Sequence, residues 1–257
     1  RLVSFWTNHF TMGGFESREL SSHAMEEGIL GSFNDSFASM LYKATTHPAM
    51  LMYLDNHISA GPNSQHVRWA RSRNEQAGLN DNLGRELLEL HTVSPDVNYT
   101  ETDIRNAAKV LAGWGMDVQG NSPQNLLEQA GTINHWDMYK KNWAEPGSKL
   151  VLGKTIYQGK QGLKQLTDFL ATHDHTINHL SFKLAEHFVR DDPQQADIDY
   201  KSNAWRQGNG SMEKIHTAVI ERAIDSKEPK FQWPMTWLFQ VIRLTDARYF
   251  KGWSEVD

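Results

Sequence analysis

The sequence predicts a mainly α-helical protein: a single multi-helical domain over residues 1–257, with one long irregular insertion at about 116–162. Apolar residues recur every three or four positions through most of the chain, which is typical of helices that bury one face. No internal repeat divides the chain, and its length is sufficient to enclose one core. Glycine, proline, asparagine and tryptophan interrupt the helical pattern in the insertion, so we expect a functional loop or a small sheet there.

The elements expected before the insertion are helices separated by polar turns. Two of them carry start signals. His47 is followed by Pro48 at a first helical position, and Thr100 with Asp103 forms a capping box. Helices are expected at about 4–11, 29–44, 48–54, 67–71, 82–92 and 100–112.

The remaining elements are a hairpin and further helices. Residues 150–152 and 155–157 are short apolar segments on either side of Gly153, and this pattern predicts two antiparallel strands. Helical spacing then resumes at about 162–171, 176–189, 212–224 and 234–244.

Composition excludes several classes of function. A net charge of −5 provides no broad basic field for nucleic acid or an anionic membrane. No apolar stretch is long enough to span a bilayer. The absence of cysteine excludes disulfides, thiolate metal sites and cysteine nucleophiles.

The chain begins with Arg1 inside an amphipathic pattern, so we expect it to be trimmed at one or both ends, with any export signal lost upstream.

Six segments in order along the chain carry a family resemblance, and the RELLELHT run within 79–92 is the most specific of them. The segments are 5–10, 47–56, 79–92, 99–114, 149–156 and 183–193. Together they resemble the bacterial family called domain of unknown function 1800. The resemblance implies a mainly helical, exported protein, periplasmic or extracellular, and a sulfatase-like protein encoded nearby as a partner. It implies no reaction, because the family's role is unassigned.

One departure from the family pattern concerns the residues before the KLVLG segment. Family members usually carry a His-Asp pair there, whereas this chain has Ala144 and Glu145. The nearby His135 and Asp137 are out of register. If the pair belongs to a site, the site has been lost or rebuilt in this chain.

The helix at 82–92 carries the main candidate site. Glu86 and His91 border its apolar stripe, and Glu89 lies on another face of the same helix. With His9 of the first helix, these are the candidate catalytic residues. Carboxylate and imidazole ligands suit a divalent metal, but spacings of five and two residues from His91 are poor for a helical metal motif. Whether a metal or other cofactor binds is left open. Arg85 and Asn8 are candidate substrate-binding residues.

A structural interpretation competes with this functional one. Arg85 and Glu89 are four residues apart and can form a buried salt bridge that holds neighbouring helices. His91 would then bond the chain where its helix ends, and His9 would be a core histidine between Phe5 and Phe10.

Tryptophan and histidine supply further candidates. Trp136 and Trp143 lie in the irregular insertion and are candidates for stacking on a carbohydrate ligand, whereas Trp6 and Trp114 are expected in the core. The histidines from 173 to 187 include His175 and His179, which are spaced for a metal, but we favour a capped, solvated helix start.

Two functions follow from these residues. The first is a hydrolase-like enzyme acting on a carbohydrate or related polymer, with Glu86 and Glu89 as acid and base. The alternative is a non-catalytic binding or maturation factor for an exported sulfatase-like partner, in which the same cluster is structural. No nucleophile elbow, phosphate loop or dinucleotide fingerprint is present.

Overall fold

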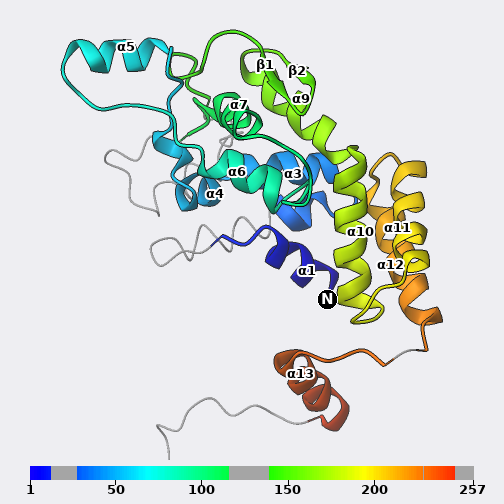
Figure 1. Ribbon diagram of the computed structural model, residues 1–257. Helices are drawn as coiled ribbons and strands as arrows, with labels where there is room; N and C mark the ends of the chain where they lie inside the picture. Colours follow the sequence, from blue (N-terminus) through cyan, green and yellow to red (C-terminus); the bar gives the residue numbers. More distant parts are fainter. Residues whose placement is uncertain (13–27, 116–138, 228, 247–257) are drawn as a thin grey trace, which may run out of the picture.

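The computed structural model describes residues 1–12, 28–115, 139–227 and 229–246 (Figure 1). These parts contain eleven α-helices and one two-stranded antiparallel hairpin, so the prediction of a mainly helical fold is confirmed. None of the described helices is long and apolar enough to cross a membrane. The α-helices are α1 (Leu2–His9), α3 (Phe37–Thr46), α4 (Pro48–Tyr53), α5 (Gln65–Ser72), α6 (Asn82–Glu89), α7 (Glu101–Leu111), α9 (Lys160–Ala171), α10 (Asp174–Phe188), α11 (Gln195–Gln207), α12 (Met212–Asp225) and α13 (Pro234–Thr245).

A continuous apolar core runs through the helices from α1 to α12, except α5. Trp6 of α1 lies at its centre with no exposed surface, and its indole Nε1 donates to Nε2 of His216 at 2.8 Å. Phe37 of α3 packs against both Trp6 and Trp205 of α11. Trp114 is also buried. Trp6 and Trp114 are therefore core residues, as expected.

Helix α3 starts later than the apolar pattern predicted. Leu30–Ser32 form a short 3-10 turn, and the α-helix begins at Phe37, after Ser36 caps it by accepting from the Ser39 amide. The expected continuous helix over 29–44 is therefore wrong at its start. Ser36 satisfies a backbone donor at the true N-terminus, and serine is favoured there for that reason.

Helices α6 and α7 pack closely and support the hairpin. A Cβ on Gly84 of α6 would lie 2.7 Å from the backbone nitrogen of Ala108 in α7, so this contact requires glycine. The capping box of Thr100 and Asp103 is present at the start of α7. Asp103 also accepts from the Leu152 amide at 2.8 Å, which ties α7 to the hairpin turn.

The predicted hairpin is confirmed. Strands β1 (Lys149–Val151) and β2 (Lys154–Ile156) pair antiparallel, with Lys149 opposite Ile156. Leu152 and Gly153 form the turn, and both have positive φ, which matches the twist of a tight hairpin.

Helices α10, α11 and α12 pack together beside this unit (Figure 1). The apolar pattern did not predict α11, because its sequence is mostly polar and its buried face carries charged residues. Asp197 of α11 is fully buried between Arg190 and Arg222, at 2.9 and 2.7 Å. Ion pairs therefore hold α11 where apolar contacts would be expected.

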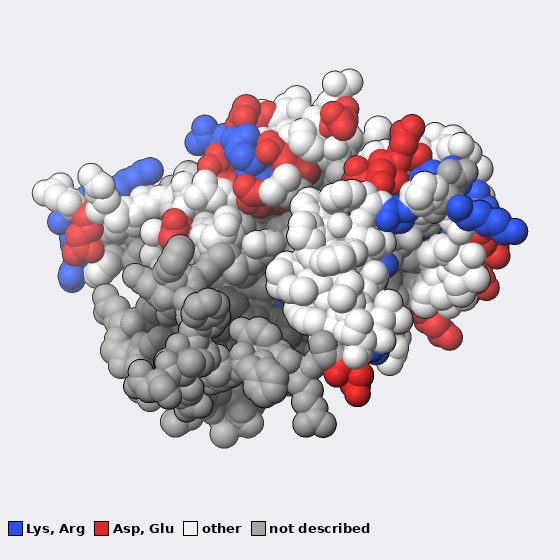
Figure 2. Space-filling model, turned by 90° about the horizontal axis from the view of Figure 1, so that it is seen from below, with Lys and Arg blue, Asp and Glu red and all other residues white. Residues whose placement is uncertain are grey.

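Helix α13 differs from the others because none of its residues is buried. Trp237 and Phe239 expose 56% and 57% of their surface. In Figure 1 the helix lies apart from the bundle, and the part of Figure 2 that corresponds to it is mostly white, because Arg243 is the one charged residue of Pro234–Thr245.

Candidate functional site

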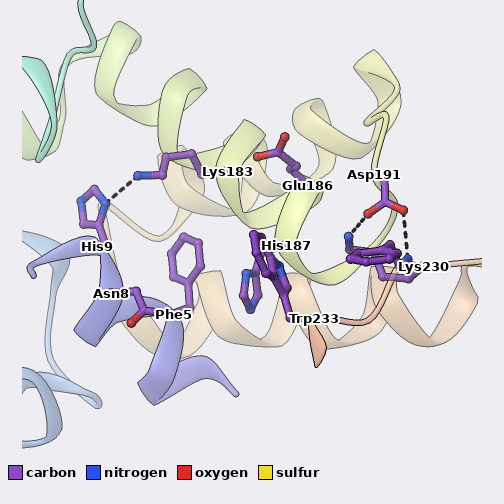
Figure 3. A pocket seen from close by; sticks show the side chains of 10 residues that line it. Phe5, Asn8, His9, Lys183, Glu186, His187, Asp191, Lys230 and Trp233 are labelled. Carbon is purple, nitrogen blue, oxygen red and sulfur yellow. Dashed lines mark hydrogen bonds and ion pairs between the residues drawn. The ribbon is translucent and has the colours of Figure 1, made fainter. Parts of the chain in front are cut away.

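A cleft of about 360 Å³ lies between α1, α10 and the segment that leads into α13 (Figure 3). Aromatic rings, amides and charged groups converge in it, a combination typical of ligand sites. The residues that line it are Phe5, Asn8, His9, Lys183, Glu186, His187, Asp191, Lys230, Phe231 and Trp233.

The inner end of the cleft is a hydrogen-bonded pair, Lys183 of α10 and His9 of α1. Lys183 Nζ lies 3.1 Å from His9 Nδ1, and His9 Nε2 lies 3.2 Å from the carbonyl oxygen of His91. A carbonyl only accepts, so Nε2 must carry the proton of the neutral ring. Nδ1 then has a lone pair, and the ammonium of Lys183 donates to it. The contacts therefore fix both the tautomer and the orientation of His9.

Local sequence explains why His9 is held there. Helix α1 places Phe5 and His9 one turn apart on its buried face, and their rings stack 6.3 Å apart at an interplanar angle of 2°. Phe10 packs edge-on against the imidazole, with ring centroids 4.7 Å apart. The expected position of His9 between Phe5 and Phe10 is confirmed, and the same packing aims its ring at Lys183.

Burial and the charge of Lys183 keep the surrounding histidines neutral. Burial, then Lys183, lowers the pKa of His9 well below its usual value. The same two causes lower the pKa of His91 to about 4 and, less strongly, that of His179 on α10. Burial also lowers the pKa of Lys183, while Glu186 opposes that shift. At neutral pH the cluster is one ammonium among neutral imidazoles.

His91 reaches this cluster because α6 ends before it. The amides of both Leu90 and His91 donate to the carbonyl of Glu86 at 3.0 Å, so the last turn widens after Glu89. The helical spacing between Glu86 and His91 therefore does not apply to the folded chain. Nδ1 of His91 is buried and, within the described residues, has no hydrogen-bond partner.

The other predicted residues of α6 lie in a different network. Arg85 pairs with both carboxylate oxygens of Glu101 in α7 at 3.1 Å and with Glu89 at 3.4 Å. The Arg85–Glu89 pair of the structural interpretation is present, but it is only partly buried, with 35% and 23% of the two side chains exposed. Burial, then a hydrogen bond to Glu89, raises the pKa of Tyr99 to about 12. This network joins α6 to α7.

Glu86 lies between Arg85 and Glu89 in sequence, but among the described residues its carboxylate shares no hydrogen bond or ion pair with them. Burial, then the charge of Glu89, raises its pKa. Among the described residues, neither Glu86 nor Glu89 lines the cleft, and no hydrogen bond or ion pair joins either carboxylate to His9 or His91. The structure thus brings His9 and His91 together with Lys183, places Asn8 in the same cleft, and leaves the carboxylates and Arg85 on the α7 side.

The two tryptophans proposed to stack on carbohydrate have different outcomes. Trp136 lies outside the described residues. Trp143 stacks on His66 of α5, with ring centroids 3.9 Å apart at 14°. The adjacent Glu145 is buried and accepts from the backbone and side-chain nitrogens of Asn63 at 2.8 and 2.6 Å. Glu145, at the position where the family pattern has its His-Asp pair, therefore holds the insertion against the start of α5.

The histidines at the start of α10 form a cap. His173 Nδ1 accepts from the His175 amide at 3.3 Å, as the capped-helix interpretation expects. Within the described residues, no group of three or more histidine, aspartate or glutamate side chains is arranged to hold a metal ion.

Sequence patterns did not identify Lys183 as a site residue. The signal was available in the spacing of His179, Lys183 and His187, which places them at four-residue intervals along one face of α10. What sequence alone lacks is the partner, because His9 lies 174 positions away.

Comparison with known proteins places the chain in a family. The family described as "Protein of unknown function (DUF1800)" matches residues 1–255. Neither a curated protein nor a solved structure matches the chain. The match covers nearly the whole sequence and agrees with the six ordered segments, so the chain belongs to the DUF1800 family.

Proposed function

We propose that this protein is a hydrolase-like enzyme that acts on a carbohydrate or related polymer, and that the Lys183 cleft is its active site. The observation that carries the proposal is the Lys183–His9 pair at the inner end of the cleft. Partly buried lysines with lowered pKa values occur where enzymes need a proton donor or base near neutral pH. The Phe5 and Trp233 rings in the lining suit the apolar face of a sugar.

The proposed acid–base roles move from Glu86 and Glu89 to residues of α10. Lys183 as the ammonium donates a proton to the leaving-group oxygen when the bond to carbon breaks. Glu186, one turn further along α10, takes a proton from the attacking water, whose oxygen forms the new bond. His9 orients the amine through Nδ1, and Asn8 offers an amide for a sugar hydroxyl. A catalytic role for Glu86 and Glu89 stays a prediction.

The proposal is tested by incubating the purified protein with a panel of neutral and acidic polysaccharides and with peptidoglycan, and measuring new reducing ends. Lys183→Met keeps the length of the side chain and removes the proton donor, so it should lower product formation by at least about 100-fold. Lys164→Met, at an exposed lysine paired with Asp168, is the matched control and should keep full activity. Equal activity of Lys183→Met and the wild type, or no product from any polymer, would count against the proposal.

The alternative of a binding or maturation factor is favoured by one observation, the exposed apolar surface of α13. Patches of this kind often mark protein interaction sites. In this alternative α13 inserts into an apolar groove of the exported sulfatase-like partner. Co-expression of the two proteins tests it: Trp237→Ser should abolish co-purification, whereas Gln240→Ser on the same helix should not. Co-purification that survives Trp237→Ser would argue against α13 as the contact.

A further inference from the structure

A second surface, separate from the Lys183 cleft, lies where α5 meets the end of the insertion. Two hollows of about 430 and 540 Å³ adjoin there and share Gln65 and Asn142. We call the residues that line them the α5 surface: Asn63, Ser64, Gln65, His66, Arg68, Trp69, Lys141, Asn142, Ala144 and Pro146. In Figure 1 α5 projects from the body of the molecule.

The α5 surface is held rigidly from below. The amides of Gly61 and His66 donate to the carbonyls of Trp143 and Asn142 at 2.8 and 2.9 Å. Glu145 adds its two bonds to Asn63, and a Cβ on Gly61 would lie 2.5 Å from the Cα of Glu145. Backbone and side-chain contacts thus fix the insertion against α5, so the hollows are preformed.

Three aromatic rings follow one another along this surface, with a cation against the first ring and another against the last. Trp143, His66 and Trp69 form a stack, with ring centroids 3.9 and 5.9 Å apart. Lys140 lies 4.6 Å from the Trp143 ring centroid, and Arg73 lies 4.4 Å from that of Trp69. Trp69 nevertheless exposes 46% of its surface, a large value for a tryptophan that contacts both His66 and Arg73. An exposed, immobilised indole is a platform for a flat ligand.

The hollow that adjoins the one lined by Trp69 is positively charged. Arg68 and Lys141 both line it and are exposed, and among the described residues neither has an ion-pair partner. Glu145, four residues after Lys141, is buried against Asn63 and does not neutralise them. The surface therefore offers two cations and one aromatic face to a ligand.

We propose that the α5 surface binds an acidic glycan, with a sugar ring against Trp69 and its carboxylate or sulfate between Arg68 and Lys141. A nucleic acid also combines rings and negative charge. It binds by neutralising many phosphates across a broad basic field, however, and this chain carries a net charge of −5. An acidic glycan needs only the few cations that the surface has. The proposal does not depend on the hydrolase proposal, because the two sites share no residue.

Calorimetric titration of the full chain tests it. The probes are an oligogalacturonide, a sulfated galactose oligosaccharide, an uncharged maltooligosaccharide and a single-stranded oligothymidylate. At least one acidic glycan should bind, and the better of the two identifies carboxylate or sulfate as the anion. Trp69→Ala should weaken binding about tenfold and Trp69→Phe less, because phenylalanine keeps a ring. Arg68→Gln should weaken binding several-fold and reduce its salt dependence.

Arg71→Gln is the matched control, since Arg71 is exposed on the same helix and lines neither hollow. It should bind as the wild type does, and circular dichroism should show unchanged melting for all four variants. Tighter binding of the oligothymidylate than of both acidic glycans would overturn the proposal. So would equal binding of the maltooligosaccharide, equal loss in Arg68→Gln and Arg71→Gln, or no binding of any acidic glycan.

Discussion

Lys183 Nζ lies 3.1 Å from His9 Nδ1, and this contact joins the first helix of the chain to α10 at the inner end of the cleft. The other imidazole nitrogen of His9, Nε2, donates to the His91 carbonyl. A lysine, a histidine and a backbone carbonyl therefore form one hydrogen-bonded series. Each member comes from a different part of the sequence. Burial lowers the pKa of both His9 and Lys183, which disfavours their charged forms.

Removing the ammonium should change the titration of His9. In Lys183→Met the pKa of His9 should rise, because the positive charge of Lys183 is the second cause of its lowering. It should stay below 6.5, because burial, the largest cause, is unchanged. Nuclear magnetic resonance of the histidine side chains measures this, with Lys164→Met as the control. An unchanged pKa in Lys183→Met would show that the two groups are not coupled in solution.

Acid should destabilise the fold through its buried histidines. Burial lowers the pKa of His91 and of His216 to about 4, whereas an unfolded chain has histidines near 6.5. As the pH falls below 6.5 the unfolded chain binds protons that the folded chain does not, so the free energy of unfolding should fall between pH 6.5 and 4. Each histidine contributes a slope of up to about 1.4 kcal/mol per pH unit.

Urea unfolding at several pH values measures that slope. His91→Gln should make it shallower, because one of the groups whose pKa burial lowers is no longer present. A variant whose pH dependence equals that of the wild type would mean that His91 is protonated in the folded chain, contrary to its burial.

Glu145 should be a structural residue. Glu145→Ala removes the acceptor of two Asn63 donors, one of them a backbone amide, and should lower the free energy of unfolding by about 1–3 kcal/mol. Glu75→Ala, at an exposed carboxylate near the end of α5, should change it little. Denaturant unfolding compares the two. Equal stability of both variants would mean that the bonds from Asn63 to Glu145 do not stabilise the fold.

Gly84 should tolerate no larger side chain. In Gly84→Ala the added methyl would lie 2.7 Å from the Ala108 nitrogen, so α6 and α7 must separate at a cost of about 1–3 kcal/mol. Gly78→Ala provides the comparison, because nothing lies within 4 Å of its added Cβ. A loss of stability in Gly84→Ala no greater than in Gly78→Ala would contradict the close approach of the two helices.

The helices that follow an apolar period could be predicted from sequence, and α11 could not. In α7, Ile104, Ala107 and Leu111 repeat at the spacing that buries one face. In α11 the buried face includes Asp197, which pairs with Arg190 and Arg222 from other segments, and Lys201, whose amine donates to the Asp197 carbonyl. Periodicity records apolar burial and carries no information about such partners.

The candidate site was predictable only in part, for the same reason. His9 and His91 were identified because they border apolar stripes. Their link to Lys183 depends on how α1 packs against α10. It also depends on the widened last turn of α6, because His91 no longer has the position that regular helical spacing would give it. The sequence groups Glu86 and Glu89 with His91, but in the structure Arg85 pairs with Glu101 of α7, and Glu89 bonds Arg85 and Tyr99 instead.

The most direct test of the central claim is the tautomer of His9 in the wild-type protein, measured by nitrogen-15 magnetic resonance at neutral pH. If Lys183 donates into His9, Nε2 carries the proton and Nδ1 has the chemical shift of an unprotonated nitrogen. A proton on Nδ1, or a doubly protonated ring, would contradict the pair and with it the proposed active site.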